Sequence, residues 1–387
     1  MNFNRMITLA TCVLVAAAVP FSQSVAEEAS PIPIGAVSTL TGSFSFPEAT
    51  AAAQAVFDRV NENGGVGGRM IQYTVEDDRM DPSSAAQAAR RLVDDEGVYA
   101  NVASASLLEC TANAGFYESR GVYSLQGTGV DPACFNTPNI SPVNTGPYTG
   151  LVVSLYYAAE ILGFDKVCSF ATGNPVQQPG WEAAIARYNR VSKKPLLVDE
   201  RNVGNTDDMT QFVLKAKGAG CQAAVFVGIE PQVVSWMQSV AAQNIQGITW
   251  IFLTPAYTLK VAEVLGETGE GIYANSEFEP FLSKSPALED WQKLMTERDI
   301  PVTSFSQGGY LAATIFVDVL KSINGEITRE SVSDALRKLD RYETPLIGTP
   351  YSVGEKTEHA SNSSSKFVKL GNGAWEVATP EFVVLPN

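Results

Sequence analysis

Short apolar runs alternate with amphipathic segments through the first part of the chain. Residues 47–63 carry apolar side chains at helical spacing, and Asp81 with Pro82 supplies the cap and first turn of a second helix. A third helix is predicted near 111–120. Strands are predicted between these helices, at 32–37, 70–75, 99–103 and 122–125. The predicted order is therefore strand, helix, strand, repeated.

The same alternation begins again after residue 146. Helices are predicted over 147–162, 181–189, 207–219 and 231–243. Apolar strands are predicted between them, at 166–170, 196–198, 223–227 and 250–254. Near-continuous apolar strands that alternate with helices are typical of parallel sheets covered on both faces. The sequence therefore predicts an α/β protein with two doubly wound, parallel-sheet lobes.

The rest of the chain follows a different pattern. Helices are predicted over 287–298, 306–322 and 329–339. Short strands are then predicted at 351–353, 366–370 and 375–377, with polar turns between them. The segment 358–365 is rich in His, Asn and Ser, which indicates a turn exposed to solvent.

Residues 61–69 read NENGGVGGR, a glycine density that raises the question of a phosphate-binding loop. A dinucleotide fingerprint needs its glycines after a strand and before a helix, so that the helix N-terminus faces the pyrophosphate. Here the helix comes first and the strand follows. No Lys-Ser/Thr pair follows the glycines, so the Walker pattern is absent as well. We interpret Gly64 and Gly65 as the stop of the helix, at the end of the sheet that does not hold ligands.

Composition and charge narrow the class of protein. The 387 residues are 45% hydrophobic and 18% charged, which is enough apolar material for a packed core. The formal net charge is −15, so binding of nucleic acid is not expected.

The N-terminus predicts a signal peptide over residues 1–26. Arg5 supplies the positive end, residues 7–19 form an apolar run, and Ser24-Val25-Ala26 has the small-x-small pattern of a cleavage site after Ala26. The alternative is an uncleaved membrane anchor, for which the run is too short. We therefore expect a protein exported to the periplasm.

The sequence offers little material for catalysis. His359 is the one histidine, and it stands in the polar turn, where a histidine is most often exposed. A two-histidine metal site is excluded, and a Ser-His-Asp triad would have to use His359. Acidic pairs such as Asp77-Asp78 stand at predicted strand ends or helix starts, where a carboxylate caps amides or is solvated. No catalytic residue, metal site or cofactor is predicted.

Four cysteines lie beyond the predicted signal peptide, an even number that suggests disulfides in an exported protein. Cys110 and Cys134 follow the third and fourth predicted strands, so both are expected at the carboxyl edge of one sheet. We predict a disulfide between them. Cys168 and Cys221 fall in or beside strands that could be neighbours, and they are either bridged or free buried thiols.

Several segments resemble the leucine/isoleucine/valine-binding protein family, the type I periplasmic solute-binding proteins of ABC importers. The most specific is VNENGGVGGRMIQYTVEDDRMDPSSAAQAARRLVDDEGV. IGAVSTLTGSF resembles the family's opening strand and loop, and GITWIFLTPAY and FSQGGYLAATIF resemble later segments of the family. The resemblance spans the mature chain. It implies two lobes joined by a three-segment hinge, with residues 27–143 and 279–348 in the first lobe and 144–278 and 349–387 in the second.

Ligands of open α/β sheets bind in the loops that follow the carboxyl ends of the strands. Together with the resemblance, this predicts the residues that contact a ligand. They are Phe44, Phe46, Ser106, Leu107, Leu108, Gly127, Thr128 and Gly129 in the first lobe, Gln177, Glu230 and Tyr257 in the second, and Phe305.

The sequence departs from the family where the amino-acid ligand is anchored. Ala256 stands where the amino-acid binders carry a carboxylate for the ammonium group, and Leu107 or Leu108 stands where they carry a hydroxyl for the ligand's carboxylate. Ser106 and Thr128 remain for a carboxylate, and Glu230 for an amine. The predicted site is apolar and rich in aromatic residues.

The resemblance implies a monomeric binding protein that delivers a small molecule to the membrane permease of an ABC importer. A branched-chain or other amino acid is the first expected ligand, and a small aromatic or aliphatic organic acid is the alternative. Two other classes stay open: an exported hydrolase and a sensory ectodomain. The single histidine disfavours the hydrolase.

Overall fold

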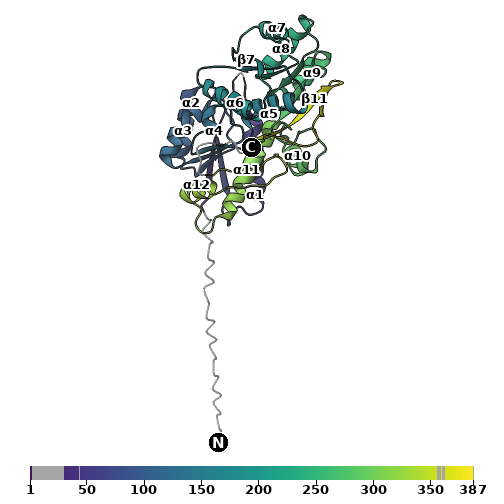
Figure 1. The fold of residues 1–387 in the computed structure, drawn as a ribbon. Helices are drawn as coiled ribbons and strands as arrows, with labels where there is room; N and C mark the ends of the chain where they lie inside the picture. Colours follow the sequence, from purple (N-terminus) through teal and green to yellow (C-terminus); the bar gives the residue numbers. More distant parts are fainter. Residues whose placement is uncertain (2–29, 43, 355–358, 360–361, 387) are drawn as a thin grey trace.

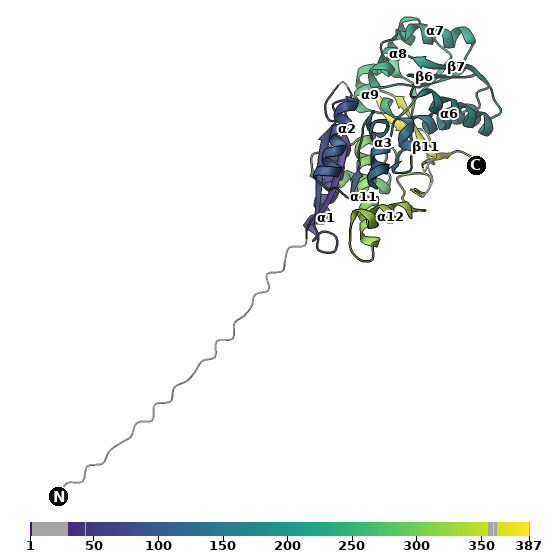
Figure 2. The ribbon, with the colours of Figure 1, turned by 90° about the vertical axis from the view of Figure 1, so that its left-hand side faces the viewer.

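The computed structural model describes residues 1, 30–42, 44–354, 359 and 362–386. The predicted signal peptide falls almost entirely outside these residues. The described chain folds into two α/β lobes, each built around a β-sheet with a parallel core (Figure 1; Figure 2). The prediction of two parallel-sheet lobes is confirmed.

The first sheet, as far as the chain is described, has five parallel strands in the order β2-β1-β3-β4-β5. Its strands are β1 (Ile32–Ser38), β2 (Ile71–Asp77), β3 (Ala100–Val102), β4 (Tyr123–Gln126) and β5 (Ile140–Pro142). The register pairs Ile32 with Ile71 and Ser38 with Asp77, so β1 and β2 end together. The strand β5 was not predicted, because a three-residue strand that ends in proline gives no alternating pattern.

Helices from both ends of the described chain cover the first sheet. The early ones are α1 (Pro47–Glu62), α2 (Pro82–Arg90) with its π-helical extension η1 (Arg91–Asp95), α3 (Glu109–Arg120) and α4 (Pro132–Phe135). The late ones are α10 (Glu289–Glu297), α11 (Ser304–Ser322) and α12 (Arg329–Arg337). Because α11 packs against α1, β3 and β4, the late helices complete the first lobe.

The second sheet runs β12-β11-β10-β9-β8-β6-β7, with β13 beside β11. Its parallel strands are β6 (Val167–Thr172), β7 (Leu196–Val203), β8 (Ala223–Val227), β9 (Thr249–Phe252) and β10 (Tyr273–Ser276). Its antiparallel strands are β11 (Ser364–Gly371), β12 (Ala374–Val377) and β13 (Val383–Val384). The predicted strand at 351–353 is wrong, since Tyr351 only forms an isolated bridge with Tyr342.

The second lobe has its own set of helices. They are α5 (Gly146–Tyr156) with its π-helical extension η2 (Tyr157–Ile161), α6 (Gln178–Val191), α7 (Thr210–Ala219), α8 (Glu230–Ala242) and α9 (Leu259–Leu265). Three short 3₁₀ turns accompany the late part of the chain: η3 (Thr254–Ala256), η4 (Gly266–Gly269) and η5 (Pro286–Leu288). Among the residues that the structure describes, no helix is long and apolar enough to cross a bilayer.

The glycine-rich turn ends α1 as predicted. Gly65 has a φ of +72°, and a Cβ there would lie 2.1 Å from the Arg69 carbonyl oxygen, so glycine is required at this position. The Asn61 side chain clamps the turn, donating to the Ile71 carbonyl and accepting from its amide at 2.8 Å each. The turn leads into the amino end of β2 and is not part of a ligand-binding edge.

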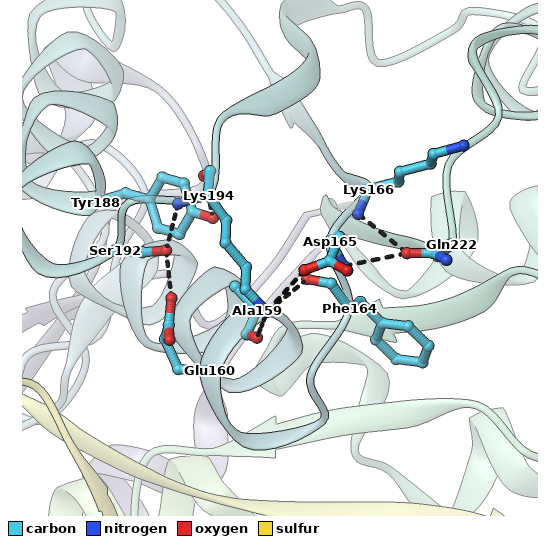
Figure 3. Close-up of polar contacts among 9 residues, drawn as sticks. All are labelled: Ala159, Glu160, Phe164, Asp165, Lys166, Tyr188, Ser192, Lys194 and Gln222. Carbon is cyan, nitrogen blue, oxygen red and sulfur yellow. Dashed lines mark hydrogen bonds and ion pairs between the residues drawn. The ribbon is translucent and has the colours of Figure 1, made fainter.

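In the second lobe, a lysine lies at the edge of the sheet formed by the amino ends of the strands (Figure 3). Lys194 donates to the carbonyl oxygens of Ala159 at 2.8 Å and Phe164 at 3.4 Å, and it pairs with Asp165 at 3.2 Å. Gln222 accepts the Asp165 amide at 3.0 Å. A cation at these helix-end carbonyls is favourable for the helix dipole. This cluster fixes the amino end of β6, opposite the edge where ligands of such sheets bind.

The described cysteines form two disulfides. Cys110 in α3 is bonded to Cys134 in α4, which confirms the predicted pair, with the Cα atoms 5.1 Å apart. Cys168 in β6 is bonded to Cys221, which follows α7, with the Cα atoms 6.0 Å apart. The second bridge settles the alternative that the sequence left open. Each lobe therefore carries one covalent cross-link.

We predict that both disulfides contribute to stability, and that the longer loop contributes slightly more. The sequence separations are 24 and 53 residues. In the chain-entropy account, losses of about 3.5 and about 4 kcal/mol are expected for Cys110→Ala/Cys134→Ala and Cys168→Ala/Cys221→Ala. Equilibrium urea denaturation of each double variant measures the change. Unfolding free energies equal to that of the wild type would contradict the prediction.

Candidate functional site

Three loops of the first lobe meet at the carboxyl ends of β1, β3 and β4. The Thr39 amide donates to the Ala105 carbonyl at 2.9 Å, and the Thr128 amide donates to the Ser104 carbonyl at 3.2 Å. Ala105 and Thr128 also form a parallel bridge beyond the ends of their strands. The structure therefore brings together the loops that carry the predicted first-lobe residues.

An apolar cluster lies on these loops, apart from the main hydrophobic cores. We call Phe44, Phe46, Leu107 and Phe305 the phenylalanine cluster; it rests on Ala49 and Ala105. The ring centroids of Phe46 lie 4.9 Å from Phe44 and 4.8 Å from Phe305, in edge-to-face arrangements. Phe46 is only 1% exposed, whereas the other three are half-buried. Phe44, Leu107 and Phe305 thus leave apolar surface for another molecule.

The Ser106 hydroxyl is already hydrogen-bonded to other protein groups. Its hydroxyl donates to the carboxylate of Asp78, which is 0% exposed. The same oxygen accepts the amides of Leu108 at 2.9 Å and Glu109 at 3.0 Å, so it caps the start of α3. A ligand carboxylate could use this hydroxyl only by displacing Asp78. Leu108 is half-buried beside it.

The acidic pair at the end of β2 holds the neighbouring loop, a role the sequence did not identify. Asp77 accepts the amides of Leu40 at 3.0 Å and Thr41 at 3.3 Å, and the Thr41 hydroxyl donates to its other oxygen at 2.5 Å. These bonds hold the pKa of Asp77 below its usual value, despite the opposing effect of burial. Asp77 and Asp78 therefore fix the loops after β1 and β3 relative to each other.

Glu109 is a buried carboxyl in the first turn of α3, next to the end of β4. Tyr117 donates to it at 2.6 Å and Gln126 at 2.7 Å. Burial raises its pKa to about 8, and the negative charges of Asp78 and Asp131 act in the same direction. Glu109 is therefore mostly neutral at pH 7. Nothing in the sequence distinguishes it from the acids that are common in the first turn of a helix.

Gly127 and Gly308 let the loop after β4 lie against α11. A Cβ on Gly308 would be 2.3 Å from the Gly127 carbonyl oxygen, so the two backbones are in contact. The Gly129 amide donates to Asn144 at 2.8 Å. Thr128, which stands between Gly127 and Gly129 in the sequence, is buried. This close approach places the start of α11, and with it Phe305, beside the loop.

The predicted residues of the second lobe stand at the starts of helices. Gln177 precedes α6 and is half-buried, and its amide donates to the side chain of Asn174 at 3.1 Å. Glu230 begins α8 and pairs with the exposed Lys260 at 2.5 Å. The Thr258 hydroxyl also donates to Glu230, at 3.3 Å. An incoming ammonium group could replace Lys260 at Glu230.

Tyr257 packs inside the second lobe and has little surface for a ligand. It is 2% exposed, and its ring stacks on Phe281 with centroids 4.1 Å apart. Its hydroxyl accepts the Leu282 amide at 3.2 Å. Trp375 lies edge-on to the same ring.

His359 is buried, so the expectation of an exposed histidine is wrong. It is 2% exposed, and its ring nitrogens lie 3.0 Å from the Val353 carbonyl and 2.7 Å from the Thr137 carbonyl. Burial lowers its pKa, and the two carbonyl contacts oppose that effect. Its neighbours in sequence are polar, but the ring satisfies two backbone carbonyls at once, which a local pattern does not reveal. No nucleophilic side chain is bonded to it among the described residues.

The described residues give no sign of a metal centre. Their one close group of three potential ligands is Cys110, Asp131 and Cys134, and the two sulfurs are bonded to each other. Two surface hollows of about 410 Å³ each lie on the first lobe, along α11. The first lies between α1 and α11 and the second between α11 and α12, and neither contains a predicted site residue.

Comparison with known proteins gives a consistent result. The sequence profile described as periplasmic binding protein matches residues 31–374. The leucine-, isoleucine-, valine-, threonine- and alanine-binding protein of Pseudomonas aeruginosa is 26% identical over 314 residues, which cover 76% of this chain and 78% of that protein.

Two solved structures have similar folds. A possible leucine/isoleucine/valine-binding protein from Rhodopirellula baltica superposes with a TM-score of 0.75 at 20% identity, covering 91% of this chain and 97% of the other. An ABC-transporter solute-binding protein from R. palustris, in complex with 4-hydroxybenzoate, superposes with a TM-score of 0.76 at 15% identity, covering 92% and 98%.

We predict that Glu109 makes folding less favourable as the pH rises. The folded state holds its proton up to about pH 8, whereas an ordinary glutamate loses it near pH 4.5. The folded state therefore binds more protons inside this window, and its stability falls across it by on the order of 5 kcal/mol. Glu109→Gln should reduce this slope in urea denaturation between pH 5 and 8.5. Glu118→Gln, an exposed change in the same helix, is the control. Equal slopes in both variants would contradict the assignment.

Proposed function

The chain belongs to the periplasmic binding protein family, and on that basis we propose that it is the solute-binding protein of an ABC importer. Members of this family are extracytoplasmic and bind small molecules. The proposed ligand lies between the two lobes, in contact with the loops at the carboxyl ends of both sheets. The observation that carries this proposal is the phenylalanine cluster, an apolar surface on three loops joined by hydrogen bonds.

The first proposed ligand is a branched-chain or other small amino acid. The phenylalanine cluster suits an apolar side chain, and burying such a group is worth about 1.5–3 kcal/mol. Glu230 supplies a carboxylate for the ammonium group, since its present partner Lys260 is exposed and exchangeable. The Pseudomonas relative is named for binding leucine, isoleucine, valine, threonine and alanine, which supports this choice.

The second proposed ligand is a small aromatic or aliphatic organic acid. Ala256 in place of the family's carboxylate favours a ligand without an ammonium group, and the R. palustris protein holds 4-hydroxybenzoate. Glu230 favours the first ligand class. Its carboxylate needs a cationic partner, which the ammonium group of an amino acid supplies and an organic acid does not. We therefore rank the amino acid first.

The proposed division into lobes follows the sequence assignment, with residues 27–143 and 279–348 in one and 144–278 and 349–387 in the other. The sheet order supports it, because β1 to β5 form one sheet and β6 to β13 the other, while α11 packs on the first. Closure of the lobes around the ligand would present a changed surface to the membrane permease. We propose that the mature chain begins after Ala26 in the periplasm and acts as a monomer.

We predict saturable binding without turnover. Thermal-shift assays of the mature protein with leucine, isoleucine, 4-methylpentanoate and 4-hydroxybenzoate should show a concentration-dependent rise in melting temperature for the true ligand class. A ligand at about 100 times its Kd stabilises by about 2.7 kcal/mol. Chromatography of the released ligand should recover it unchanged. A product formed from any of the four would contradict a carrier and favour an exported enzyme.

We predict that Phe305→Ala weakens ligand binding by about tenfold or more, because the ligand loses an apolar contact worth on the order of 1.5 kcal/mol. Phe116→Ala is the matched control, since Phe116 is half-buried on α3 beside Arg90 and Arg120 and packs against a different apolar cluster. Isothermal titration calorimetry of both variants gives the two affinities. Equal losses in the two variants would remove Phe305 from the proposed site.

A further inference from the structure

The described chain passes between the lobes three times, and the three passages meet at Glu277. The first passage leads from β5 to α5, the second from β10 to α10 and the third from α12 to β11. Glu277 follows β10 directly and belongs to the second passage. It is 7% exposed, so its carboxylate is withdrawn from water at the point where the lobes are joined.

The Glu277 carboxylate binds the first passage. One of its oxygens, Oε1, accepts the Gly146 amide at 2.7 Å and the Asn144 side chain at 3.1 Å. Asn144 in turn holds the binding loop of the first lobe, because it accepts the Gly129 amide at 2.8 Å. The hinge carboxylate is therefore two hydrogen bonds away from a predicted ligand residue.

The third passage is bonded to the same residue. The Asn362 side chain donates to the Glu277 carbonyl at 2.9 Å and is 1% exposed. Glu279, two residues further along the chain, forms an ion pair with Lys366 of β11 at 2.7 Å, and both side chains are buried. The Glu277 side chain therefore binds the first passage, and its backbone carbonyl binds the third.

Glu277 gains or loses its proton near neutral pH. Burial raises the pKa of Glu277 to about 7, and the bonds from Gly146 and Asn144 oppose the rise. The second passage carries Glu279, which pairs with Lys366 of β11, and Lys284. The described ionisable side chains of the third passage are Lys338, Asp340, Arg341, Tyr342, Glu343, Tyr351 and His359, and Tyr148 lies in the first turn of α5. Tyr148 is occupied by ring contacts with Phe135 and Trp181.

We propose that Glu277 is a proton-responsive latch in the hinge. When it is protonated, the neutral carboxyl stays buried and the lobes keep the arrangement of this structure. When it is ionised, the carboxylate favours an arrangement in which the passages separate enough for water to reach it. The orientation of the lobes, and with it the readiness to bind, then depends on pH.

The direction follows from linkage between proton binding and conformation. An arrangement that hydrates Glu277 returns its pKa toward the usual glutamate range, so the buried arrangement binds the proton more tightly. Raising the pH therefore shifts the population toward the hydrated arrangement, by about tenfold for each unit of difference in pKa between the two. The inference rests on the proposed function only in that the lobes move relative to each other.

Electron–electron distance measurements on ligand-free protein test the latch. Spin labels at Glu118→Cys in α3 and Lys217→Cys in α7 report on the two lobes, because both positions are exposed. The distance distribution should change between pH 5 and 8 in the otherwise unaltered chain. It should stay constant in Glu277→Gln, and Glu109→Gln, which removes a buried carboxyl outside the hinge, should retain the response. A distribution that does not depend on pH, or one that responds equally in Glu277→Gln, overturns the proposal.

A second measurement covers the case in which Glu277→Gln does not fold. Hydrogen exchange of the Gly146 amide in the unaltered chain, corrected for the intrinsic rise with pH, should lose protection between pH 5 and 8. Constant protection overturns the latch. Because no ligand is present in either experiment, a negative result leaves the proposed binding function intact, and a failed ligand screen leaves the latch intact.

Discussion

The hydrogen bonds that Glu277 accepts from Asn144 and Gly146 join two of the three passages between the lobes, and Asn362 adds the third. These bonds connect the segments that link the two sheets. They are buried, which makes each one stronger than it would be in water and makes the loss of a partner costly. A rigid lobe can be built many ways, but a two-lobe binding protein needs a junction that is both defined and movable.

The loops at the carboxyl edge of the first sheet show how a parallel sheet prepares a site. Parallel strands deliver their following loops to one edge, and carboxylates at the end of β2 then fix two of those loops. The phenylalanine cluster lies on this prepared surface. Acidic side chains are therefore used to position the loops, while apolar side chains are left for contact.

Much of the fold could be predicted from local patterns. The apolar runs of β1 and β8, the glycine stop after α1 and the Cys110–Cys134 bridge all follow from residues close in sequence or from the edge of one sheet. The structure departs from prediction where distant segments decide. The strand β10 has four residues and pairs with β11 some ninety positions later, as the register of Tyr273 with Lys369 shows. His359 is buried because two carbonyls from other segments surround it.

Some residues of the candidate site could also be predicted from the sequence, and others could not. Phe44, Phe46, Leu107 and Phe305 were expected together and lie together, although their contact with a ligand stays a prediction. Asp77 and Asp78 hold loops whose identity the sequence did not reveal, since their partners come from other elements. The central claim is that a small molecule binds between the lobes. A crystal structure of the protein with its ligand tests it most directly: the account predicts contact with the phenylalanine cluster and with second-lobe loops at once, and a ligand held by one lobe alone would contradict it.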